Sequence, residues 1–155
     1  MKAIVESQSA TQTYDVFLSH SFKDYELILG LAELLKGQSY SVYVDWLEDP
    51  TLDRNSVTSE TAAKLRTRMK SCKSLIFATS DNSSTSKWMP WELGFFDGSK
   101  PDKISILPIS QSTTNIFSGQ EYLGLYPYIS IDTVSRALLL NRPNGVIKLN
   151  SWVRT

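Results

Sequence analysis

The residues with the clearest capacity for chemistry stand in one stretch, residues 83–96, where a polar run ends in two tryptophans around a proline. Pro90 fits the first turn of a helix, where its missing N–H would have no partner, so we expect a helix over 90–97. Glu92 then lies in the first turn, where the helix dipole and free backbone N–H groups favour an ionised carboxylate. Trp88 would form an aromatic wall beside that carboxylate. A fixed negative charge beside such a wall suits a substrate that carries or develops positive charge.

The same residues also have a purely structural interpretation. A glutamate at the third helical position commonly caps its helix, and tryptophans are common in cores. Placed carboxylates also arise in ordinary ion-pair networks, so these residues alone favour the structural interpretation. The surrounding elements have to decide between the two.

The elements that position this stretch alternate between strand and helix. Short β-rich or apolar runs predict five strands, over residues 14–19, 40–46, 74–79, 103–109 and 128–132. One helix is predicted from an apolar stripe that consists of Leu27, Ile28, Leu31, Leu34 and Leu35. Others are predicted from about residue 58, over 134–140 and over 146–153. This alternation predicts an α/β fold, a five-stranded parallel sheet with helices on both faces.

Polar and aromatic residues follow the predicted strands at the point where each strand ends. His20 and Ser21 follow the first strand, Asp45 and Trp46 end the second, and the loop before Trp88 follows the third. Ligands of parallel sheets gather at the carboxyl ends of the strands, so we expect all of these residues on one rim. The helix of Glu92 starts from the same rim, which favours the functional interpretation of that carboxylate.

Length, charge and cysteine content exclude several classes of protein. The 155 residues suggest one domain, residues 14–155, after a loose leader over 1–13 with no signal-peptide or membrane-span pattern. Acidic and basic residues balance at 16 each, so no strong basic field is available for nucleic acid. The single cysteine, Cys72, and the single histidine, His20, argue against a disulfide framework and against a metal site. We expect a cytoplasmic protein with no membrane segment.

Familiar catalytic motifs are absent from the sequence. There is no GxGxxG or GxxxxGK[ST] phosphate loop and no GxSxG elbow. The first strand ends in Ser19-His20-Ser21 instead of the clustered acids of a phosphoacceptor domain.

Three boxes of the sequence resemble the conserved boxes of TIR (Toll/interleukin-1 receptor) domains, in the same order and at matching spacing. They are Tyr14-Asp15-Val16-Phe17-Leu18-Ser19-His20-Ser21, Val42-Tyr43-Val44-Asp45, and the W-x-x-x-E pattern from Trp88 to Glu92. The resemblance covers about residues 14–132 and is strongest to stand-alone bacterial TIR proteins, including those of Thoeris-type antiphage defence.

The resemblance implies a flavodoxin-like fold and cleavage of NAD at the nicotinamide–ribose bond, giving ADP-ribose or a cyclic ADP-ribose isomer. Glu92 occupies the family's catalytic position, and residues 47–57 correspond to its mobile BB loop, which gates the pocket. Trp88 would pack against the substrate, while the rim would be lined by His20, Ser21, Asp45 and Trp46. Phe22 stands where some family enzymes place a basic residue near the phosphates, so phosphate binding would use other groups, with Arg54 as a candidate.

The partners that the resemblance implies are NAD as substrate without a further cofactor, other TIR domains through self-association, and a downstream effector that senses the product. The alternative is a non-enzymatic TIR module that recruits other TIR domains, because receptor-type members use the same surfaces only as scaffolds. A more distant alternative is a related enzyme that acts on another nucleotide.

Overall fold

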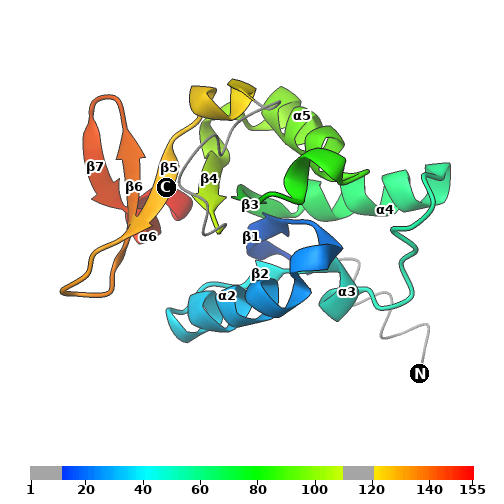
Figure 1. Ribbon diagram of the computed structural model, residues 1–155, viewed down its shortest axis with the longest axis horizontal. Coiled ribbons are helices and arrows are strands. Elements are labelled where there is room, and N and C mark those ends of the chain that lie inside the picture. Colours follow the sequence, from blue (N-terminus) through cyan, green and yellow to red (C-terminus); the bar gives the residue numbers. More distant parts are fainter. Residues whose placement is uncertain (1–11, 110–120) are drawn as a thin grey trace.

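The computed structural model describes residues 12–109 and 121–155, except for the side chain of Ser84. In these residues a single sheet of seven strands has the order β2-β1-β3-β4-β5-β6-β7 (Figure 1). The strands are β1 (Tyr14–Ser19), β2 (Val42–Tyr43), β3 (Cys72–Thr79), β4 (Ile104–Pro108), β5 (Tyr128–Ile131), β6 (Leu138–Arg142) and β7 (Gly145–Lys148). Neighbours from β2 to β5 pair in parallel, and β6 and β7 pair antiparallel.

Helices cover both faces of this sheet. The α-helices are α2 (Tyr25–Gly37), α3 (Asp45–Glu48), α4 (Ser59–Lys70), α5 (Met89–Ser99) and α6 (Leu149–Val153). One core lies between the sheet and helices α2 and α6, and a second lies between the sheet and helices α4 and α5. The predicted α/β class, with helices on both faces, is therefore confirmed.

The central strands serve both cores because successive side chains of a strand point to opposite faces. In β1, Val16 and Leu18 join the core under α2, while Phe17 joins the core under α4 and α5. Strand β3 alternates in the same way. A strand buried on both faces reads as a continuous apolar run, which is why the sequence revealed β1 and β3.

The prediction of a five-stranded sheet is corrected by the C-terminal part of the fold. The helix predicted over 134–140 is replaced by β6, which forms a hairpin with β7, and only the last part of the helix predicted over 146–153 is helical, as α6. A short apolar run does not distinguish helix from strand. The turn at Pro143-Asn144 favours a hairpin over a helix, because it joins the paired residues Arg142 and Gly145. Gly145 has a φ of 133°, which suits glycine.

Two further predictions are revised. The second strand is shorter than the predicted 40–46, since it ends at Tyr43 and Asp45 already begins α3. In α2 the buried stripe is Ile28, Ala32 and Leu35, while Leu27 and Leu34 are 57% and 41% exposed.

Two remaining predictions concern the leader and membrane-spanning segments. The predicted leader lies outside the described residues except for its last two. No helix in the described part of the chain has the length and apolarity needed to cross a membrane.

Candidate active site

The carboxylate of Glu92 is buried at the start of helix α5. The helix begins at Met89, one residue before the predicted Pro90, and the Met89 N–H donates to Ser86 Oγ at 3.3 Å. Glu92 is only 1% exposed, and its Oε1 accepts a hydrogen bond from Ser19 Oγ at 2.7 Å, at the end of β1. Burial raises the pKa of Glu92 from its ordinary value of 4.5 to about 7. A carboxyl group with a pKa near neutrality is suited to accept or release a proton during a reaction.

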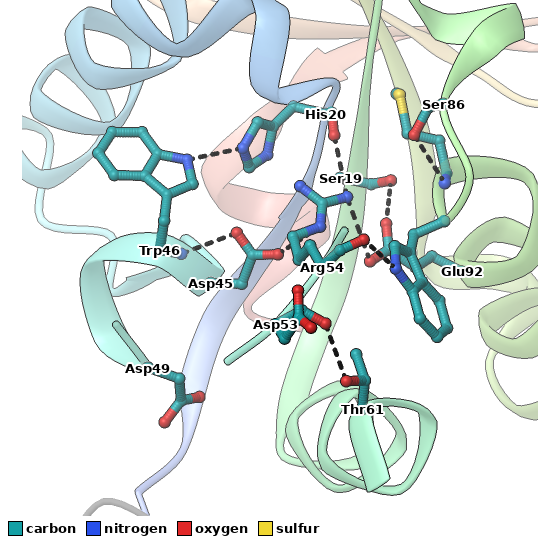
Figure 2. A network of polar contacts seen from close by, with 12 residues as sticks. Ser19, His20, Asp45, Trp46, Asp49, Asp53, Arg54, Thr61, Ser86 and Glu92 are labelled. Atoms are coloured by element: carbon teal, nitrogen blue, oxygen red, sulfur yellow. Dashed lines mark hydrogen bonds and ion pairs between the residues drawn. The ribbon is translucent and has the colours of Figure 1, made fainter. Parts of the chain in front are cut away.

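A cation from another element faces this carboxylate. Arg54, in the loop between α3 and α4, places Nη2 3.9 Å from Glu92 Oε2. Its Nε pairs with Asp45 Oδ2 at 2.7 Å, and Nη2 also donates to the His20 carbonyl at 3.2 Å (Figure 2). The positive charge of Arg54 lowers the pKa of Glu92 and so opposes the effect of burial. The site therefore already accommodates a planar cation beside Glu92.

Three hydrogen bonds hold this loop closed over the carboxylate. The backbone carbonyls of Asp53, Arg54 and Asn55 accept, in that order, from Thr61 Oγ1 at 2.9 Å, Trp88 Nε1 at 2.9 Å and Lys87 Nζ at 2.8 Å. Three successive carbonyls are thus bound by side chains from α4 and from the segment before α5. Together with the Arg54 side chain, these bonds fix residues 53–55 against the site.

The stem of the same loop is anchored in the interior. Asp49 accepts two hydrogen bonds from the buried guanidinium of Arg68, both at 2.8 Å, and one from Tyr43 Oη at 2.7 Å. These bonds hold the pKa of Asp49 below its usual value despite burial. Bidentate pairs of this kind are geometrically specific, so the loop leaves the fold in a defined direction.

Of the predicted rim residues, Asp45 lies in the site and His20 and Trp46 adjoin it. His20 is 1% exposed, with Nδ1 2.9 Å from the Leu18 carbonyl and Nε2 2.9 Å from Trp46 Nε1. Since a carbonyl only accepts and an indole N–H only donates, His20 is neutral and carries its proton on Nδ1. Burial lowers its pKa accordingly. His20 therefore holds Trp46 in place and has no ring nitrogen left for a substrate.

The other two predicted site residues have local structural contacts. Ser21 is buried, and its Oγ accepts from the Lys23 N–H at 3.3 Å. Trp88 is 3% exposed, packs edge-on against Trp91 and donates to the Arg54 carbonyl. In this closed arrangement Trp88 supports the loop over the site.

Two residues of the site were not predicted to lie beside Glu92, since Ser19 was not among the candidates and Arg54 was a candidate only for phosphate binding. Ser19 binds Glu92 directly, and the sequence signal for it was its place at the carboxyl end of the first strand. Arg54 is the only basic residue in the loop over 47–57, and a lone cation in a loop that reaches the rim was the signal for it.

No protein-family model matches the chain. The chain is 59% identical over 122 residues to a protein of Bacillus cereus (strain MSX-D12) named "Probable 3' cyclic ADP-D-ribose synthase ThsB'"; the match covers 78% of this chain and 63% of that relative. It is 36% identical over 85 residues to "Putative cyclic ADP-D-ribose synthase TIR2" of Cytobacillus dafuensis, over 54% of this chain and 22% of that relative.

The chain thus spans less than two thirds of the length of either relative. Within the matched part, the identity to the Bacillus cereus protein is far above what a shared fold alone would give. The chain is therefore a homologue of the Bacillus cereus protein over most of its own length, and this similarity agrees with the resemblance to bacterial TIR proteins that its three sequence boxes carry.

Proposed function

We propose that this protein is an NAD-consuming TIR enzyme that breaks the nicotinamide–ribose bond and releases a cyclic ADP-ribose-type product. The observation that carries the proposal is the buried carboxylate of Glu92 facing a guanidinium at the carboxyl end of β1. The names of the two relatives support it, since one is named a probable and the other a putative cyclic ADP-D-ribose synthase. NAD serves as the substrate, and the reaction needs no further cofactor.

The chemistry needs one well-placed negative charge. When the bond breaks, its electron pair leaves with nicotinamide, and the ribose becomes an oxocarbenium-like cation. The Glu92 carboxylate stabilises that cation, and in a site from which water is excluded the stabilisation is far larger than in bulk solvent. Ser19 keeps the carboxylate oriented through its 2.7 Å hydrogen bond. The nicotinamide ring of NAD is cationic and departs as a neutral molecule, so it needs no general acid. Glycosidases differ, because they use two carboxyl groups.

The sugar cation is then captured by an oxygen or nitrogen nucleophile. Attack by a hydroxyl of the substrate's other ribose forms a C–O bond and a cyclic product, and attack by water gives ADP-ribose. The attacking hydroxyl loses its proton, and Glu92, with a pKa of about 7, is suited to accept it. The name of the Bacillus cereus relative favours the 3' cyclic isomer as the product.

Access to Glu92 requires movement of the loop. The Arg54 guanidinium lies where the cationic end of the substrate has to come, and Glu92 is only 1% exposed. The hydrogen bonds to the carbonyls of 53–55 must therefore open before the substrate binds. We propose that this opening accompanies self-association. The exposed apolar side chains of α2 offer a surface for that contact, namely Leu27, Leu29 and Leu34.

The proposed biological setting is bacterial antiphage signalling in the cytoplasm, in which an effector senses the cyclic product. The scaffold alternative predicts that the same protein assembles without consuming NAD. The two proposals differ in one measurable quantity, the release of nicotinamide.

The direct test is nicotinamide release from NAD by the purified protein at high concentration and under crowded conditions. We expect release by the unaltered protein and its loss in both Glu92→Gln and Glu92→Ala. Glu60→Gln is a matched control, because Glu60 also lies in the first turn of a helix but is exposed. Circular dichroism shows whether each variant is folded.

Two outcomes would contradict the proposal. Release that survives both substitutions would remove Glu92 from the mechanism. Absence of release at every concentration, with assembly intact by light scattering, would favour the scaffold alternative.

A further inference from the structure

An array of three aromatic rings extends outward from the rim beside the site. The ring of Phe22 meets that of Trp46 edge-on, with centroids 6.1 Å apart at 90°, and stacks on Tyr25 at 5.6 Å and 20°. Phe22 is 59% exposed and Tyr25 is 45% exposed, whereas Trp46 is partly buried. We call Trp46, Phe22 and Tyr25 the aromatic shelf. Its inner end is fixed and its outer end is open to solvent.

The inner end is fixed by hydrogen bonds that run back to the sheet. Trp46 Nε1 donates to His20 Nε2, and His20 Nδ1 donates to the Leu18 carbonyl of β1, each at 2.9 Å. The Trp46 N–H also donates to Asp45 Oδ1 at 2.8 Å. Because the backbone N–H and the indole N–H of Trp46 are both hydrogen-bonded, its ring loses little conformational freedom when a ligand binds. Figure 2 shows the indole directed toward His20, on the side of Asp45 away from Glu92.

The ion pair of Arg54 and Asp45 lies between the shelf and Glu92. Arg54 Nη2 lies 3.2 Å from the His20 carbonyl and 3.9 Å from Glu92 Oε2. A ligand whose sugar reaches Glu92 therefore passes Arg54 before it reaches Trp46 and Phe22. The order along this path is the Glu92 carboxylate, the Arg54 guanidinium paired with Asp45, and the apolar ring faces.

A dinucleotide presents complementary groups in the same order. Its cationic ribose end matches the carboxylate, its pyrophosphate matches the guanidinium, and the flat base at its other end matches the ring faces. Once Arg54 is displaced from Glu92, the pyrophosphate is its natural new partner. A phenylalanine at position 22 supplies no charge for a phosphate, but it supplies a face on which a base stacks.

We infer that the aromatic shelf binds the adenine of the substrate by stacking, with Phe22 as the contact surface and His20 as the residue that positions Trp46. This inference rests on the proposed function for the identity of the substrate. It adds Phe22 and Tyr25 to the predicted rim residue Trp46 as determinants of which nucleotide is accepted.

The test separates binding of adenine from the reaction. AMP carries the adenine without the nicotinamide ribose, and nicotinamide mononucleotide carries the reacting part without the adenine. In Phe22→Ala we expect KM for NAD to rise between about fivefold and a hundredfold, the range that loss of one base stack gives. The value of kcat should change little, and cleavage of nicotinamide mononucleotide should be unaffected. Phe22→Tyr should restore KM, and Val134→Ala, an exposed apolar residue outside the shelf and outside α2, should leave KM unchanged.

Equilibrium binding of AMP gives a readout that does not depend on catalysis. We expect AMP to quench the tryptophan fluorescence of the Glu92→Gln protein and to lose that effect when Phe22→Ala is added. If AMP binds through Phe22 but NAD is never cleaved, the shelf stands and the proposed function fails. If cleavage requires Glu92 but neither KM nor AMP binding responds to Phe22→Ala, the shelf is wrong.

A third result would assign the shelf to self-association. In that case Phe22→Ala would weaken assembly in sedimentation experiments and lower activity only at low protein concentration, with KM for NAD unchanged at high concentration. This outcome would also overturn the inference.

Discussion

Replacement of Glu92 by glutamine should stabilise the fold at alkaline pH while removing the reactive carboxylate. Glu92 is buried, and its pKa in the folded protein is about 7, above the ordinary value of 4.5 that we take for the unfolded chain. A carboxyl group with a raised pKa stabilises the fold fully below its unfolded pKa, and this stability is lost as the pH rises through the folded pKa. Glutamine has nearly the same shape and carries no charge, so it does not have this pH dependence.

The size of the effect follows from the two pKa values. Their difference corresponds to roughly 3 kcal/mol of unfolding free energy at about 1.36 kcal/mol for each pH unit. Between pH 5 and pH 8 the unaltered protein should lose about 2.5 kcal/mol of this amount relative to Glu92→Gln. For a domain of 155 residues that is a relative shift in Tm of about 5–10 °C.

The assay is urea and thermal unfolding of the two proteins at pH 5, 6, 7 and 8. Glu60→Gln serves as the control, because its carboxylate is exposed and its difference from the unaltered protein should stay nearly constant with pH. A difference between Glu92→Gln and the unaltered protein that is the same at pH 5 and pH 8 would refute the reasoning. It would mean that Glu92 is not desolvated in solution, as an open loop would allow.

Three further predictions concern charges around the site and in the core. Arg54→Gln should move the rising limb of the kcat/KM–pH profile to higher pH, because the charge of Arg54 lowers the pKa of Glu92; a limb that stays in place would show that the two charges do not interact. Arg68→Ala should lower the unfolding free energy by roughly 3–5 kcal/mol in urea titrations, because it leaves the Asp49 carboxylate buried without its bidentate cation; a loss below ~1 kcal/mol would contradict this. Cys72, whose pKa burial raises to about 12, should react with a thiol reagent only at the rate of unfolding, and rapid labelling of the native protein would contradict this burial.

The chemically important helix could be predicted from the sequence because its signals are local. A proline in the first turn and a carboxylate two residues later indicate a helix start with few alternatives, and the structure begins that helix at Met89. The rim position of Asp45 followed from strand order alone, since parallel strands end at one edge. The contacts that shape the site were not predictable in the same way. Arg54 meets Asp45 and Glu92 through a loop path that no periodic pattern encodes.

The errors of prediction have an equally physical origin. The predicted stripe of α2 is right for Ile28 and Leu35, which are buried, and wrong for Leu27 and Leu34, which are exposed. Several apolar stripes on one helix are equivalent until the sheet selects one of them. Strand β6 was mistaken for a helix because its apolar run is short, and its identity depends on pairing with β5 and β7.

The anchoring of the loop at Asp49 separates two properties that share one segment of chain. Arg68 and Tyr43 hold its first end, and the Thr58 side chain, which accepts from the Thr61 N–H, holds its second end at the start of α4. The loop can therefore move between Asp49 and Thr58 while its two ends stay in place. We expect substitutions between these two anchors to change how readily the site opens without breaking the Asp49–Arg68 pair.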